Sequence, residues 1–240
     1  MTSNIQLYQG DCLEVMKNIP DKSVDLVLTD PPYRMTKRGK SCRPNWMPDN
    51  MGSNVFDGDI PDFKEWLKLC YDKLNNKTHL YIFTNTVSLQ DILNSATHVG
   101  FKLHNVLTMI KDTGMPNRWY YKQTELILFL RKGEAKPIND YTSRDWFNAT
   151  MPKAKDGKLH ITQKPLDVIE KLLTNSSFES QNILDPFMGS STTAIASLNT
   201  NRNFIGIEKD ENYFNIGVNR VKEHIKCQDL KTELVINTVD

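Results

Sequence analysis

The sequence contains few cysteines, no long apolar run and almost no excess of charge, and each shortage argues against a class of protein. Its four cysteines are scattered without a C-x-x-C pair, so neither a disulfide framework nor a metal site is expected, and a reducing cytoplasm suits the chain. No stretch approaches the roughly 18 apolar residues of a membrane span, and we recognise no charged and apolar leader. We therefore expect a soluble cytoplasmic protein with no membrane partner.

The charge balance and the length set two further limits. The 30 basic and 29 acidic residues leave a net charge of +1, which argues against a nucleic-acid coat but permits a local basic patch. At 240 residues the chain can bury a full α/β core, and we expect one domain with insertions. Any site for a polyanion must come from clustered basic residues.

The first thirty residues predict the start of a parallel sheet. Residues 5–8 alternate like a strand, residues 12–18 follow a capping turn as a helix, and residues 24–30 form an apolar, branched run typical of a buried strand. Strand, helix and strand in this order are the βαβ unit of a parallel sheet.

The second predicted strand ends at Asp30-Pro31-Pro32-Tyr33. The two prolines cannot donate to a strand ladder, and each restricts the residue before it to extended backbone. A carboxylate, stiff carbonyl groups and a tyrosine ring are therefore presented together at the end of a buried strand.

The rest of the chain continues the alternation of strands and helices. We predict strands over residues 80–83, 103–110, 124–130, 182–184 and 204–207, and helices over residues 63–74, 87–97, 165–177, 192–199 and 211–226. The tail after residue 228 is too short to assign. This order favours a doubly wound, mostly parallel sheet.

Three irregular stretches interrupt the pattern. Residues 34–61 begin with five cations in ten residues, which either form a solvated loop or contact nucleic acid. Arg118 lies among aromatic residues in 114–121, which can stack on a base or cover a core edge. Residues 133–160 are polar and irregular. The cations expected to contact DNA are Arg34, Lys37, Arg38, Lys40, Arg43 and Arg118.

Residues 183–208 read as strand, glycine-serine turn, helix, strand and acid. Such a turn brings backbone N–H groups to a ligand, and an acid about 20 residues later can bind a ribose hydroxyl, which fits Gly189 and Glu208. The G-x-G-x-x-G fingerprint is absent, and Asp185 would repel a pyrophosphate. A positively charged nucleoside fits better than a dinucleotide, while the alternative is a structural turn whose acids cap or face solvent.

These motifs together resemble the S-adenosylmethionine-dependent DNA amino-methyltransferases. The pairing of Asp30-Pro31-Pro32-Tyr33 with a later Asp185-Pro186-Phe187-Met188-Gly189 is similar to the β-class motif order of that family. Gly10-Asp11-Cys12 and Thr162-Gln163-Lys164-Pro165 match it as well. The resemblance implies a Rossmann-like class I methyltransferase fold with helices on both faces, spanning residues 1–240, with DNA-contacting insertions near 34–61 and 133–160.

The resemblance also implies the cofactor contacts. Asp185 would meet the methionine ammonium and Glu208 the ribose diol, whereas Lys164 would help to hold the carboxylate end unless it is a solvated lysine. Ser191 departs from the family, which usually has glycine there. The full implied cofactor set is Asp11, Cys12, Asp30, Thr162, Lys164, Asp185, Phe187, Gly189, Ser190, Ser191, Thr192 and Glu208.

For catalysis, the resemblance implies Asp30, Pro31, Pro32 and Tyr33. Acceptors on Asp30 and Pro31 would hold the hydrogens of an exocyclic amine, and Tyr33 would stack on a base flipped out of duplex DNA. The aspartate favours N6 of adenine, as in DNA methylation by restriction–modification enzymes. N4 of cytosine, RNA or a protein amide as the acceptor, and a catalytically silent DNA-binding regulator, stay open, as do a homodimer and the recognition sequence.

Overall fold

The computed structural model describes residues 2–32, 61–116, 120–151 and 163–239. Within these ranges, nine strands form one sheet in the order β6-β4-β5-β3-β2-β7-β8-β1-β9. The strands are β1 (Ser3–Gln9), β2 (Val24–Thr29), β3 (Leu74–Thr84), β4 (Lys102–Met115), β5 (Lys122–Lys132), β6 (Trp146–Ala149), β7 (Asn182–Asp185), β8 (Asn203–Glu208) and β9 (Thr232–Thr238). The helices are α1 (Cys12–Val15) with the short 3-10 turn η1 (Met16–Asn18), α2 (Phe63–Lys73), α3 (Leu89–Val99), α4 (Leu166–Ser176), α5 (Thr192–Asn199) and α6 (Glu211–Cys227).

The sheet is mostly parallel, as predicted. β2 pairs in parallel with β3 and β7, and β1 pairs in parallel with β8 and β9. β5 runs antiparallel to both β3 and β4. Only residues 116–121 connect β4 to β5, which is too short for the crossover that a parallel pair needs. The doubly wound class is confirmed, with an antiparallel hairpin inserted beside β3.

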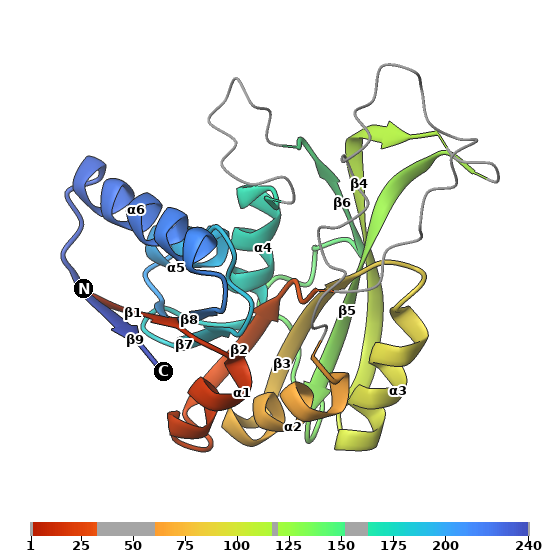
Figure 1. Ribbon diagram of the computed structural model, residues 1–240. Helices are drawn as coiled ribbons and strands as arrows, with labels where there is room; N and C mark the ends of the chain where they lie inside the picture. Colours follow the sequence, from red (N-terminus) through yellow and green to blue (C-terminus); the bar gives the residue numbers. More distant parts are fainter. Residues whose placement is uncertain (1, 33–60, 117–119, 152–162, 240) are drawn as a thin grey trace.

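Helices cover both faces of the sheet, with α1, α2 and α3 on one face and α4, α5 and α6 on the other (Figure 1). The alternation along β2 explains both layers, since successive side chains of a strand point to opposite faces. Val27 packs in the apolar cluster that contains Trp66 of α2, while Leu28 packs in the cluster that contains Ile169 of α4. A strand buried on both sides therefore lies at the centre of the fold.

Two strands were missed by the sequence patterns. β9 lies in the unassigned tail and pairs with the outer edge of β1. β6 lies inside residues 133–160, so the prediction that this whole stretch is irregular was wrong. Both are edge strands in which, apart from Ala149, the side chains are partly buried or exposed, and a half-polar run carries a weak period-two signal. Of the helices in the described ranges, none combines the length and apolar character that crossing a bilayer requires.

The carboxyl ends of the central strands meet at one edge of the sheet. Asp185 ends β7 and Glu208 ends β8, while Asp30 follows β2 and Asp11 follows β1 by two positions. The register pairs Gln9 with Glu208 across β1 and β8. This edge, where parallel strands deliver their following loops, is the place where α/β sheets bind ligands.

Candidate active site

Asp30 lies at the end of β2 with its two carboxylate oxygens in different surroundings. Oδ2 accepts the Lys164 ammonium at 2.7 Å. Among the described residues, Oδ1 is buried and has no hydrogen-bond partner. Pro31, which follows, is buried and holds the backbone there. A buried acceptor with an unused lone pair is costly unless a ligand supplies a donor, so Oδ1 indicates where a donor group binds.

Lys164 also contacts a second carboxylate. Its ammonium lies 3.1 Å from Oε2 of Glu125 on β5, and Lys111 of β4 lies 3.3 Å from the other oxygen, Oε1. The Lys164 side chain is only 8% exposed and its ammonium lies 5.2 Å from the centre of the Phe83 ring. Four charges of alternating sign therefore line up at the end of the sheet, and the alternative of a solvated lysine was wrong.

The neighbouring charges shift the pKa values of the two acids, Asp30 and Glu125. Burial raises the pKa of Asp30, while Lys164 counteracts part of that rise. Burial also acts to raise the pKa of Glu125, but Lys164 and Lys111 together bring it below its ordinary value. Glu125 is therefore ionised at neutral pH.

Asp185 is buried at the end of β7, with both carboxylate oxygens engaged. The Thr29 hydroxyl donates to Oδ1 at 2.8 Å, the Thr193 hydroxyl donates to Oδ2 at 2.7 Å, and the Phe187 N–H donates to Oδ1 at 3.1 Å. Burial raises the pKa of Asp185 to about 7, against the lowering effect of the two hydroxyls. Asp185 ties β2, β7 and α5 together, and the alternative that its carboxylate faces solvent was wrong.

The turn between β7 and α5 forms an open cradle. Gly189 has φ +48°, and no atom lies within 4 Å of the place a Cβ would take. Its N–H donates to Oε2 of Glu208 at 2.9 Å. Ser191 also has a left-handed conformation, with φ 60° and ψ 36°, directly before α5. The departure from glycine at this position therefore falls on a residue whose backbone favours glycine.

Arg220 of α6 and Trp66 of α2 both contact the turn between β7 and α5. Arg220 donates to the Ser190 carbonyl at 2.8 Å and to the Thr192 hydroxyl at 3.0 Å. Phe187 packs edge to face on Trp66 of α2, with ring centres 5.3 Å apart. The predicted turn residues are thus held from both faces of the sheet.

Glu208 and Asp11 border the cradle on the neighbouring strands. Glu208 accepts the Asp210 N–H at 2.9 Å as well as that of Gly189, and burial raises its pKa. Asp11 caps α1 by accepting the Leu13 N–H at 2.9 Å. Burial raises the pKa of Cys12 to about 12, so its thiol stays protonated and packs against the core.

The donors and acceptors of the cradle fit a cationic nucleoside. Asp185, Glu208 and Asp11 are acids, and the open side of Gly189 leaves room for a ligand against the backbone. Glu208 keeps lone pairs beyond the two it shares with backbone N–H groups, so it can accept from a diol. A pyrophosphate would face three carboxylates and would be repelled.

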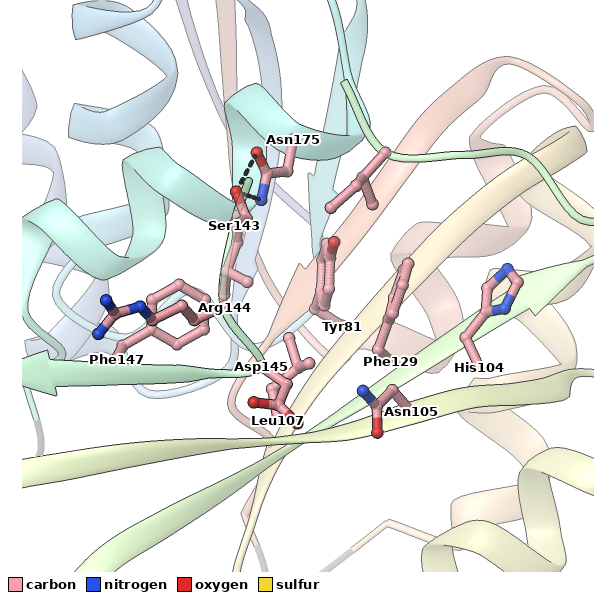
Figure 2. A pocket seen from close by; sticks show the side chains of 12 residues that line it. Tyr81, His104, Asn105, Leu107, Phe129, Ser143, Arg144, Asp145, Phe147 and Asn175 are labelled. Carbon is pink, nitrogen blue, oxygen red and sulfur yellow. Dashed lines mark hydrogen bonds between the residues drawn. The ribbon is translucent and has the colours of Figure 1, made fainter. Parts of the chain in front are cut away.

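A cavity of about 280 Å³ lies elsewhere, between the outer strands and α4. In Figure 2, Tyr81 and Phe129 lie face to face, and Ser143 is hydrogen-bonded to Asn175 across the rim. Its walls come from β3, β4, β5, β6, α4 and residues 138–145, and they include none of the acids of the candidate site. The cavity is therefore separate from that site.

The structure brings together most of the predicted site. Glu125 was missed, because the sequence offers only an acid in an apolar strand; its position directly before the apolar run 126–130 was the one available signal. Several predicted residues lie outside the described residues, namely Tyr33, Arg34, Lys37, Arg38, Lys40, Arg43, Arg118 and Thr162.

Comparison with known proteins identifies the family. The sequence profile of the family described as DNA methylase matches residues 24–219, which include Asp30, Glu125, Asp185 and Glu208. The chain belongs to this DNA methylase family. The predicted kinship with the S-adenosylmethionine-dependent DNA amino-methyltransferases is thereby confirmed, for a family that covers both N6 and N4 types.

Curated relatives of this DNA methylase include type II methyltransferases. M2.MboI of Moraxella bovis is 27% identical over 248 residues, covering 92% of this chain and 88% of the relative. M.HinfI of Haemophilus influenzae is 27% identical, covering 90% of this chain and 68% of the relative. The similarity therefore extends over nearly all of this DNA methylase.

Solved structures of similar fold confirm the architecture of the DNA methylase. The complex of M1.HpyAVI with SAM has a TM-score of 0.68 at 27% identity and covers 90% of this chain and 99% of that chain. The PvuII DNA methyltransferase, described as cytosine-N4-specific, has a TM-score of 0.69 at 15% identity, covering 98% of this chain and 96% of that chain. At 15% identity, the similarity to the PvuII enzyme shows a shared fold and nothing further.

Proposed function

We propose that this DNA methylase transfers a methyl group from S-adenosylmethionine to the N6 amine of adenine in double-stranded DNA. The observation that carries the proposal is Oδ1 of Asp30, a buried acceptor without a partner among the described residues, at the strand end beside the cradle. The similarity to M1.HpyAVI, solved with SAM, supports the cofactor.

The residues at the β2 end supply what an aromatic amine needs. The nitrogen lone pair is delocalised into the base, so the amine is a weak nucleophile. Oδ1 of Asp30 and the carbonyl of Pro31 would accept its two hydrogens and turn the lone pair out of the ring plane. Positioning supplies much of the rate, and no covalent enzyme intermediate is required.

The cradle would hold the cofactor beside that amine. S-adenosylmethionine supplies an electrophilic methyl group on a positively charged sulfur. Glu208 would accept from the ribose hydroxyls, and Asp185, Asp11 and the Gly189 turn would form the acidic surroundings of the ligand's positive groups. Asp185 already accepts from three donors, and a carboxylate has about four acceptor sites, so one site is left for the methionine ammonium.

The choice of base and substrate rests on the motif and on the loops. Aspartate in the first position of Asp30-Pro31-Pro32-Tyr33 favours adenine. A base inside a duplex cannot reach Oδ1, so it must be flipped out. Tyr120 and Tyr121, directly before β5, are 86% and 60% exposed and can stack on a base or sugar. We further propose a cytoplasmic location; a homodimer is compatible with this function.

The experiment is to incubate the protein with methyl-labelled S-adenosylmethionine and a mixture of duplex DNA, structured RNA and protein, and to separate the labelled nucleosides and amino acids after digestion. Label in N6-methyladenine is expected. Label in N4-methylcytosine instead would reassign the base, and label only in RNA or protein would reassign the substrate. No transfer to any acceptor would favour a silent DNA-binding regulator.

Asp30→Ala is expected to lower methyl transfer by at least about 100-fold, since the acceptor for the amine is lost. Cofactor binding should persist, because Lys164 keeps Glu125 as its partner. Asp21→Ala is a matched control, because Asp21 also pairs with a buried lysine, Lys73, at 2.7 Å but precedes β2 at the other end of the sheet. Equal activity of Asp30→Ala and Asp21→Ala would contradict the assignment.

A further inference from the structure

Four charged side chains from four segments form one line at the catalytic edge. Asp30 follows β2, Lys164 precedes α4, Glu125 belongs to β5 and Lys111 belongs to β4. The contacts run from Asp30 Oδ2 to Lys164 at 2.7 Å, from Lys164 to Glu125 Oε2 at 3.1 Å, and from Glu125 Oε1 to Lys111 at 3.3 Å. The formal charges cancel, which is what allows partly buried ions to stay ionised.

This series of contacts gives the two carboxylate oxygens of Asp30 different surroundings. A lysine ammonium is a compact charge on a flexible stem, and next to a lone carboxylate it can approach either oxygen. Here a second carboxylate also attracts the Lys164 ammonium, because Oε2 of Glu125 lies 3.1 Å from it as an ion-pair partner. Oδ2 of Asp30 is thereby used by Lys164, and Oδ1 keeps its lone pair.

We propose that Glu125 is a positioning residue for methyl transfer, which holds Lys164 on Oδ2 of Asp30 so that Oδ1 is kept for the hydrogen of the target amine. The inference rests on the proposed function, and it assigns a role to a residue outside both sequence motifs. Glu125 acts through Lys164 and need not touch the substrate. Lys111 would support it by pairing with Oε1, the oxygen turned away from Lys164.

Removing the charge of Glu125 should misplace Lys164. In Glu125→Gln the ammonium loses the attraction of its second anion and should shift toward Oδ1 of Asp30, where it competes with the target amine. We expect kcat to fall about 10- to 100-fold, as for misplaced catalytic groups, with the KM for S-adenosylmethionine changed much less.

The pH profile separates positioning from simple damage. Transfer requires ionised Asp30, so the acid limb of kcat follows the pKa of Asp30. That pKa is set by burial, by Lys164, and by the negative charge of Glu125, which raises it. Asp185 is the other acid facing Asp30, and Lys111 lies beyond Glu125. The acid limb of the kcat–pH profile should therefore move to lower pH in the Glu125→Gln protein. Simple destabilisation of the fold would not produce this shift.

Two further variants keep the test decisive. Glu125→Ala leaves space for a small carboxylate, so added formate should restore part of kcat. Lys164→Arg keeps the charge, but its planar fork binds both oxygens of a carboxylate, so it should lower kcat even with Glu125 present. The control is Asp21→Asn, which removes a carboxylate from a buried lysine away from the site.

The experiment measures kcat, KM and the acid limb for these variants, after methyl transfer by the unaltered protein has been established. A lower kcat with a shifted limb in Glu125→Gln, formate rescue and a slow Lys164→Arg support the role. Unchanged kcat, a lower kcat with an unmoved limb, or a fully active Lys164→Arg would overturn it and leave the proposed function intact. No transfer by the unaltered protein would overturn the proposed function, and the positioning role with it.

Discussion

A tight contact between the cofactor turn and α6 leads to a prediction about Gly217. A Cβ built on Gly217 would lie 2.4 Å from the Ser191 Oγ and 3.1 Å from the Gly189 carbonyl oxygen. The first distance is far below a normal contact. Ser191 is fully buried, and its Oγ donates to the Met188 sulfur at 3.5 Å, so moving the Oγ away from the new methyl group would disturb this contact.

The magnitude follows from two opposing effects. Forcing a methyl group into a packed site costs about 1–3 kcal/mol, while replacing glycine by alanine inside a helix gains up to about 1 kcal/mol. Gly217→Ala should therefore destabilise the protein by about 1–2 kcal/mol. Because the strain falls on the turn of Gly189, affinity for S-adenosylmethionine should fall as well.

Ser191→Gly supplies the matched second change. It removes the Oγ that the new methyl group meets, and glycine adopts the left-handed conformation of position 191 without strain. By itself it should be close to neutral, because the relief of about 1–2 kcal/mol is offset by the greater freedom of the unfolded chain. In the Ser191→Gly background, Gly217→Ala should then cost little.

The assay is a double-mutant cycle by urea unfolding, with cofactor binding by calorimetry on the same four proteins. A coupling of about 1–2 kcal/mol is expected, within the range found for residues in contact. Additive effects of the two substitutions, or a Gly217→Ala protein as stable as the parent, would refute the packing described for this turn.

Two further predictions concern charge. The pKa of Asp185 is 3.8 in the unfolded chain and about 7 in the folded protein, so its contribution to stability falls as pH rises between these values. The Asp185→Asn protein should therefore gain up to about 4 kcal/mol in free energy of unfolding relative to the parent between about pH 4 and pH 8. Urea unfolding at several pH values measures this difference, and a difference that stays constant with pH would contradict the assignment. Neutralising Lys37 and Arg38 together should reduce the slope of log affinity for DNA against log salt concentration by about 2. The control Lys77→Gln, at the surface of β3, should leave that slope unchanged. An unaltered slope in the double variant would show that neither Lys37 nor Arg38 contacts a DNA phosphate.

Local signals in the sequence were sufficient for most of the fold. The apolar run of β2, the prolines after Asp30 and the capping residue Asp11 act within a few residues of backbone, so each predicts an element boundary. β3, β4 and β5 extend further than predicted, and β9 was missed, because largely polar segments there are held by pairing with a neighbouring strand. Such pairing leaves little trace in the strand's own composition.

The sequence by itself determined which chemistry is present: an acid after a buried strand, a glycine-serine turn after another, and an acid at the end of a third. Their convergence at one edge follows from parallel topology and could be inferred. Only the tertiary structure decided that Lys164 bridges Asp30 and Glu125, and that Asp185 is buried among hydroxyls. Contacts between side chains so distant in the chain depend on strand order and packing, which no local pattern encodes.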